Sequence, residues 1–187
     1  SEQPVVGQVN GSMNVRIHRG CDEIGGSCVE VEYCGSRLIL DIGRPLSGGR
    51  DEFIPLPGVP GLATGHPSIA AILLSHGHQD HWGLIDQVHH SIPVYIGKRA
   101  ANVLRAADFW GAGIDLCERG HFDDRVPMSI GEFTVTPYLV DHSGFDAYAF
   151  VIEAAGQRLM YSGDFRGHGR KSSVFERLIA DPPGDID

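Results

Sequence analysis

A short stretch of this chain concentrates three histidines and an aspartate directly after an apolar run. The stretch is Ser75–Gly83, and the run before it is Ile69–Leu74. His76 and His78 are two residues apart, so extended or loop backbone turns both side chains to one side, whereas a helix would need a spacing of three or four. Neutral imidazoles and carboxylates are ligands that zinc and similar ions accept. The sequence therefore predicts a metal site on a loop at the end of a strand.

Four motifs of this chain resemble those of the metallo-β-lactamase fold superfamily of hydrolases, and they follow in that family's order. The central one is His76–His81. The others are Leu38–Gly43 with Asp41, Val140–Ser143 with His142, and Tyr161–Phe165 with Asp164. The resemblance implies an α/β fold, namely a metallo-β-lactamase-like αββα sandwich with its site at the strand ends. This chain would supply the N-terminal portion of that fold.

The resemblance also implies a set of metal ligands and a reaction. Two zinc ions would be held by the side chains of the motifs: His76, His78 and His142 for the first ion, Asp80 and His81 for the second, and Asp164 bridging both. Asp41 would support the ligand loop through hydrogen bonds. The enzyme would be a metal-dependent hydrolase whose nucleophile is a metal-bound hydroxide. Asp80 or Asp164 would orient that hydroxide or accept its proton.

Three further features resemble the β-CASP branch of the family, which includes ribonuclease J-like and messenger-RNA 3′-end-processing nucleases. They are Glu23–Ser27, Asp141–Asp146 and Ser162–Arg166. This resemblance implies a phosphodiesterase that acts on RNA. The net charge of −9 disfavours nonspecific nucleic-acid binding, because phosphate recognition needs a cationic surface. A local basic cluster nevertheless follows Asp164, and it is either a phosphate clamp or a solvated turn: Arg166, His168, Arg170 and Lys171.

Two other functions remain open at this point. One is a small-molecule hydrolase of the same fold that acts on thioesters, lactones or β-lactams, and the other is a metal-binding fragment without activity of its own. The family adds a last histidine to the second metal downstream of the Gly-Asp motif, and Pro182–Asp187 contains none. We therefore expect a flexible lead-in over residues 1–12 and a metallo-β-lactamase-like domain over 13–187 that is truncated at its C-terminus. Its second zinc site would be partly filled and its activity low.

Composition and apolar patterning place the chain among soluble single-domain proteins. Its 187 residues, 42% hydrophobic and 21% charged, suffice for one core. No apolar run approaches 18 residues, and Ser1–Pro4 has neither a basic region nor an apolar signal core. The chain is predicted to be cytoplasmic and without a membrane partner, and a homo-oligomer is compatible with the sequence. Its four cysteines are predicted to be free thiols.

Hydrophobic periodicity predicts the strands that position the motifs. A three-stranded antiparallel meander is expected between Val15 and Ile42, and later strands over residues 133–139, 148–152 and 158–161. Between them, residues 43–68 are predicted to form a long loop, which either shapes the rim of the site or lies on the surface. A short strand is expected at Pro93–Ile96.

Apolar spacing also predicts three helices. A helix of about two turns is expected at Leu84–Val88, and a longer one at Lys98–Phe109 with a buried face made of Ala100, Val103, Leu104 and Ala107. The last helix would begin with a capping box at Ser173–Glu176 and run to Ala180. Trp82 and Trp110 are predicted to be packing residues.

Overall fold

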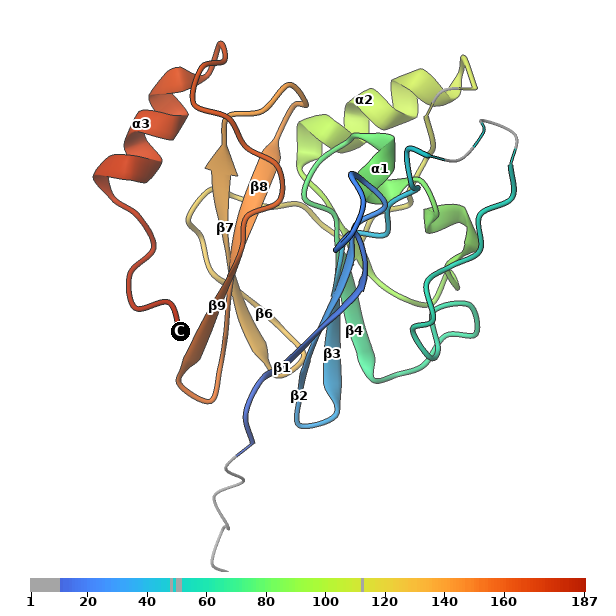
Figure 1. Ribbon diagram of the computed structural model, residues 1–187, viewed down its shortest axis with the longest axis horizontal. Helices are drawn as coiled ribbons and strands as arrows, with labels where there is room; N and C mark the ends of the chain where they lie inside the picture. The colour runs from blue at the N-terminus through green and yellow to red at the C-terminus, as the bar shows by residue number, and fades with distance from the viewer. Residues whose placement is uncertain (1–10, 48, 50–51, 112) are drawn as a thin grey trace, which may run out of the picture.

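The computed structural model describes residues 11–187, except for residues 48, 50, 51 and 112, and shows two β-sheets that face each other (Figure 1). The first sheet has the strand order β1 (Asn14–Arg19), β2 (Cys28–Tyr33), β3 (Ser36–Leu40), β4 (Ile69–Leu73) and β5 (Val94–Tyr95). The second has the order β6 (Met128–Ile130), β7 (Phe133–Val140), β8 (Ala147–Ala154) and β9 (Gln157–Tyr161). The helices are α1 (Gln79–Trp82), α2 (Lys98–Asp108) and α3 (Ser172–Ala180), with a 3₁₀ turn at Ile85–Gln87.

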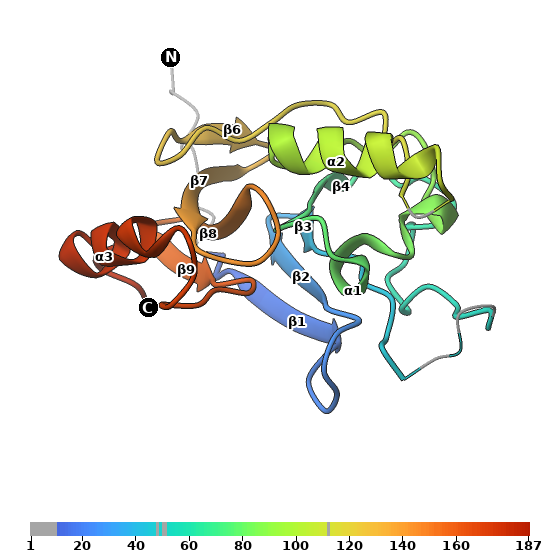
Figure 2. The same ribbon diagram turned by 90° about the horizontal axis from the view of Figure 1, so that it is seen from above.

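The helices cover the outer faces of the sheet pair (Figures 1 and 2). One buried cluster lies between the first sheet and α2, where Ile39 and Ile72 meet Leu104. A small cluster lies between the second sheet and α3, around Leu178. With a third cluster between the two sheets, the layers follow the order of the predicted αββα sandwich, and the fold class is confirmed. None of the helices in the described part of the chain is long and apolar enough to cross a membrane.

β3 and β4 are buried on both faces, which explains why they read as continuous apolar runs. Leu38 and Leu40 point between the sheets, and Ile39 points to the helical side. The same alternation places Phe150 of β8 between the sheets. Each such side chain contributes roughly 1.5–3 kcal/mol on burial, so this double-sided packing stabilises β3 and β4 within the sandwich.

The ends of four strands meet at one edge of the molecule. β3 and β4 pair in parallel, so both end there, and β7 and β9 flank the antiparallel β8 and therefore run in one direction. The backbone N–H of Tyr148 in β8 donates to the carbonyl oxygen of Ser75 at 2.9 Å. This hydrogen bond joins the second sheet to the loop that follows β4. Gly163 lies against the same Ser75, with a Cβ position 3.0 Å from its Cβ.

Several predicted elements are confirmed. The meander consists of β1, β2 and β3. The strands predicted over residues 148–152 and 158–161 are β8 and β9, which form a hairpin that turns at Ala155 and Gly156. The described residues between 43 and 68 contain no helix or strand, only an isolated bridge between Gly25 and Pro45. Guanidinium groups of Arg19, at the end of β1, and of Arg37, near the start of β3, donate to carbonyl oxygens of this long loop, which therefore contacts both ends of the first sheet.

Three details of the helices differ from prediction. The segment after the histidine cluster forms the single turn α1 and a 3₁₀ turn, not a two-turn helix at 84–88, because Gly83 separates the two. In α2, Val103 is 49% exposed, and Trp110 beyond its end is 80% exposed, so neither packs in the core. α3 begins at Ser172 without a side-chain cap, so the capping box is not formed. Trp82 is buried, as predicted.

The cysteines give a simple check of this packing. Cys21, Cys34 and Cys117 are exposed, whereas Cys28 is buried and its burial raises the pKa of its thiol to about 12. We expect iodoacetamide to modify three thiols per native chain and the fourth only after denaturation, because the thiolate is the reactive form. Peptide mass spectrometry identifies the sites, and rapid labelling of Cys28 in the native chain would contradict the position of β2.

Candidate metal centre

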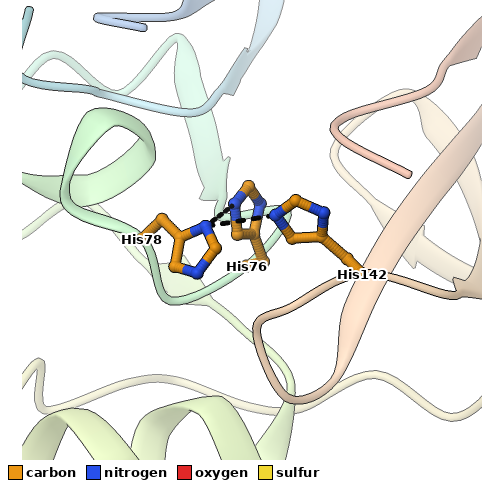
Figure 3. Close-up of side chains that lie close together, drawn as sticks. All are labelled: His76, His78 and His142. Atoms are coloured by element: carbon orange, nitrogen blue, oxygen red, sulfur yellow. Dashed lines mark hydrogen bonds between the residues drawn. The ribbon is translucent and has the colours of Figure 1, made fainter. Parts of the chain in front are cut away.

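Three histidines converge at the edge where the strands end. His76 and His78 follow β4, and His142 follows β7. Nε2 of His76 lies 3.0 Å from Nδ1 of His78, and Nε2 of His142 lies 3.1 Å from that same nitrogen (Figure 3). His76 is fully buried, while the other two rings are half-buried. The three rings therefore present nitrogens to one point that is reached from solvent.

A second group shares His76 and adds His81 and Asp164. Their ligand atoms all lie within 4.8 Å of one another. His81 is buried in α1, and Asp164, at the end of β9, is exposed with its Oδ2 3.5 Å from Nε2 of His81. The two groups are adjacent because His76 belongs to both.

Asp80, predicted as a ligand of the second metal, lies at the border of this group. Its Oδ2 is 3.7 Å from Nε2 of His81. Its backbone is enclosed by glycines: a Cβ on Gly43 would lie 1.7 Å from the Asp80 carbonyl oxygen, and one on Gly25 would lie 2.8 Å from the Asp80 Cβ. The Gly-rich turn after β1 and the Asp-x-Gly motif therefore both shape the turn that carries Asp80, whose ligand role stays a prediction.

Asp41 supports the histidine loop from beneath. It is fully buried, with Oδ1 accepting from the Ser75 backbone N–H at 2.7 Å and Oδ2 accepting from the Ser75 hydroxyl at 2.8 Å. Oδ2 also lies 2.7 Å from Nδ1 of His81, and because a carboxylate only accepts, His81 donates there. The Nε2 of His81 is thereby left to face Asp164. Asp41 thus bonds to the loop that carries the histidines, and its role in supporting a metal centre stays a prediction.

The sequence matches the family described as "Beta-lactamase superfamily domain" over residues 50–178, which is more than half of the chain. This protein belongs to the β-lactamase superfamily. The metallo-β-lactamase fold protein YhfI from Bacillus subtilis superposes with a TM-score of 0.56 at 18% identity, covering 82% of this chain and 63% of that one.

Among curated relatives, this superfamily member is similar to ribonucleases of the J type. It is 38% identical over 168 residues to the RNase J-like protein of Methanocaldococcus jannaschii, covering 80% of this chain and 36% of the relative. It is 29% identical over 154 residues to ribonuclease J of Helicobacter pylori, covering 79% of this chain and 22% of the relative. The chain thus spans between about a fifth and two fifths of the length of these relatives.

The electrostatics of this superfamily site suit a cation. Burial and the neighbouring imidazoles lower the pKa of His76 to about 2, and burial also lowers the pKa of His142, so these rings are neutral. Burial acts against a charged His81, but Asp164 and Asp41 outweigh it and raise the pKa of His81 to about 10. The hydrogen bond with His81 lowers the pKa of Asp164 to about 2, so this carboxylate is ionised. Neutral imidazoles and an ionised carboxylate are the forms that bind metal, so His76, His142 and Asp164 are in the binding form, whereas His81 carries a proton that a metal would displace.

The donor distances also fit a metal ion. Tetrahedral ligation by imidazole at about 2.0–2.1 Å separates two ligand nitrogens by roughly 3.3 Å. The nitrogens of the three-histidine cluster are 3.0 and 3.1 Å apart, close to that separation. The residues of this superfamily site therefore fit a metal of the zinc type.

The predicted basic cluster is divided by the fold. Arg166 turns inward: its backbone N–H donates to the Asp141 carbonyl oxygen at 2.8 Å, and its Nε lies 3.8 Å from Oδ1 of that buried carboxylate. Lys171 donates to the Gly144 carbonyl oxygen at 3.2 Å. A Cβ on Gly144 would lie 3.4 to 3.8 Å from all three rings of the histidine cluster, so Lys171 is brought beside them. His168 and Arg170 are exposed.

Three functional contacts escaped the sequence reasoning. Ser75 bonds to Asp41 through both its backbone and its hydroxyl. The carboxylate of Asp141 accepts from the Gly169 backbone N–H at 2.8 Å and so holds the basic loop against the site. The Tyr161 hydroxyl donates to Asp41 at 2.6 Å. All three residues lie within stretches that the sequence analysis singled out, but their partners lie 28 to 120 residues away in the chain, beyond the reach of local spacing.

Proposed function

We propose that this protein is a metal-dependent phosphodiesterase that acts on RNA, with a chemistry of the ribonuclease J type. The observation that carries the proposal is the pair of adjoining ligand groups, three histidines in one and His76, His81 and Asp164 in the other. Ribonuclease J relatives that align over about four fifths of the chain support the choice of RNA as substrate. The family itself supports hydrolysis as the reaction class.

Zinc is the metal that we propose for both positions. His76, His78 and His142 would hold one ion, and His81, Asp80 and Asp164 would hold the other, with Asp164 between the two. Imidazole and carboxylate donors without cysteine are common in catalytic zinc sites. His81 is preset for this role, because its Nδ1 is engaged by Asp41 and only its Nε2 is free to face a metal.

The reaction would divide into metal chemistry and side-chain chemistry. When bound, two zinc ions lower the pKa of a water molecule and polarise the phosphoryl oxygens. Asp164 is ionised and exposed, and it would orient the attacking water or accept its proton. Asp80 is the other carboxylate that could orient the water or accept its proton. Asp41 would keep His81 oriented while the charge around the site changes.

The substrate phosphate would be met by Lys171 and by the exposed members of the basic loop. Lys171 is hydrogen-bonded to Gly144, which lies against the histidine rings, and burial lowers the pKa of the Lys171 amine. Arg170 and His168 are exposed on the same loop. Arg166, which faces Asp141, would hold the loop in place rather than bind phosphate.

The direct test is a comparison of substrates on zinc-loaded protein. A single-stranded RNA, a thioester, a lactone and a β-lactam are incubated with this chain and with any longer natural form. We expect RNA cleavage that is lost in His76→Ala. Cleavage of the small molecules without RNA cleavage would favour a small-molecule hydrolase. Tight zinc binding without turnover in any form would favour a metal-binding domain.

Binding to RNA tests the basic loop independently of turnover. We expect Lys171→Gln to weaken binding to single-stranded RNA. The negative slope of log K against log salt should become shallower by roughly 0.7, the value for one phosphate contact on a single strand. Fluorescence anisotropy over a salt series measures it. Arg16→Gln, which removes the same charge from β1, is the control and should leave the slope unchanged. Equal slopes in the wild type and Lys171→Gln would remove Lys171 from the interface.

A further inference from the structure

Tyr161 reaches the support of the metal centre from the opposite sheet. It is the last residue of β9, and its hydroxyl donates to Oδ2 of Asp41 at 2.6 Å. That oxygen also accepts from the Ser75 hydroxyl and from His81. The other donors to Asp41, from Ser75 and His81, follow β4 in the first sheet. Tyr161 is thus the donor that crosses between the sheets.

The same short segment delivers the second contact to His81. Asp164 is three residues beyond Tyr161, and its Oδ2 lies 3.5 Å from Nε2 of His81. His81 is therefore contacted at Nδ1 by a carboxylate that Tyr161 holds and at Nε2 by the carboxylate that follows Tyr161. The distance between these two carboxylates across the imidazole depends on where β9 ends relative to β3.

The ring of Tyr161 is itself fixed by packing. It lies parallel to the Phe150 ring, with the planes 6° apart and the centroids 6.4 Å apart, and Phe150 is fully buried between the sheets. Burial and the charge of Asp41 raise the pKa of Tyr161, so the hydroxyl keeps its proton and donates a hydrogen bond to the carboxylate. A rigid ring with one donated hydrogen bond is suited to setting a distance.

We propose that Tyr161 is a positioning residue for the second metal site: its hydroxyl locks Asp41 to the end of β9 and so holds His81 and Asp164 in register with each other. The inference rests on the proposed function, because it assumes that His81 and Asp164 bind a metal. It adds a residue outside the ligand set whose effect falls on one metal position. The three-histidine position is linked to Asp41 only indirectly, through the Ser75 hydroxyl that lies 3.1 Å from Nδ1 of His76, and its ligands follow β4 and β7.

The test compares Tyr161→Phe with Tyr148→Phe. Both variants lose one phenolic hydroxyl in the second sheet, but the Tyr148 hydroxyl donates to the Phe122 carbonyl oxygen, outside the metal centre. Zinc-loaded proteins are titrated with a chelator, and retained zinc is measured by elemental analysis. We expect Tyr161→Phe to hold the more weakly bound zinc about 10–100-fold less tightly, as is usual for such supporting contacts. Tyr148→Phe should match the wild type at both positions.

A second readout follows His81 itself. In the wild type, ¹⁵N NMR of the histidine side chains should show the Nδ1 of His81 carrying its proton, and in Tyr161→Phe this signal should broaden or shift while those of His76 and His78 stay. This measurement also decides the matter if the wild type retains a single zinc. An unchanged His81 signal with unchanged zinc release would overturn the proposal. Equal weakening of zinc binding at both positions, together with a lower unfolding temperature, would show that the hydroxyl stabilises the fold as a whole. That result would also overturn the proposal.

These outcomes are distinct from a failure of the proposed function. A wild-type chain that binds no zinc would refute the metal-dependent hydrolase. Two zinc ions held alike by the wild type and by Tyr161→Phe would leave that function intact and refute only the role of Tyr161.

Discussion

Replacement of His76 or His78 by alanine is expected to abolish tight zinc binding at the three-histidine cluster. A structural zinc site contributes on the order of 10–16 kcal/mol through about four ligands, so the loss of one ligand costs roughly 3 kcal/mol, or about a hundredfold in affinity. The structure adds a difference between the two variants. His76 belongs to both ligand groups, whereas His78 belongs to one. In the proposed assignment both residues are ligands of the first position, but the His76 ring also lies against His81, with the ring centroids 4.1 Å apart, so His76→Ala should weaken the second position as well and His78→Ala only the first.

Competition with a chromophoric chelator measures these affinities. His90→Ala is a matched control, because His90 is exposed and stacks on His89 outside the metal centre. Its zinc content and affinity should equal those of the wild type. Zinc retained at wild-type affinity in both His76→Ala and His78→Ala would refute the ligand assignment.

The second large effect is expected from Gly43→Ala. A Cβ at this position would lie 1.7 Å from the Asp80 carbonyl oxygen and 2.8 Å from the Ser27 backbone nitrogen, and neither backbone can yield without moving a turn. We expect a loss of roughly 3 kcal/mol in the free energy of unfolding, as for severe overpacking, and a Tm lower by roughly 6–12 °C. The displaced turn carries Asp80 and His81, so zinc at the second position should fall as well.

Thermal unfolding followed by circular dichroism measures the Tm in metal-free protein. Gly58→Ala is the control, because nothing lies within 4 Å of its Cβ position, and it should change the free energy of unfolding by no more than about 0.5 kcal/mol. A Gly43→Ala variant as stable as Gly58→Ala would mean that α1, which carries Asp80, is not held against the Asp-x-Gly loop.

The sequence was sufficient for the elements whose signal is local and periodic. β3 and β4 read as apolar runs because both faces are buried, and α2 was placed within one residue of its observed end. The support given by Asp41 to the histidine loop followed from the family pattern and agrees with its four accepted hydrogen bonds.

The misses arise where tertiary contacts decide. Val103 sits at helical spacing on α2, yet the sheet beneath that helix covers Ala101 in its place. The basic residues after Asp164 were predicted as one cluster, but the fold separates them. Arg166 faces the buried carboxylate of Asp141, whereas Lys171 is hydrogen-bonded to Gly144 beside the histidines. Tyr161 bonds to a residue 120 positions earlier, and only the docking of one sheet on the other brings them together. No periodicity in the chain encodes such a pair.

The division of the ligand groups between two sheets has a mechanical consequence. His78 and His142 are 64 residues apart in the chain, and each lies at the end of a different sheet. An ion held between them would cross-link the layers much as a disulfide does, and its binding free energy would add to the stability of their docking. The layer of apolar side chains around Phe150 would then set the metal affinity from a distance, because any widening between the sheets separates the ligands.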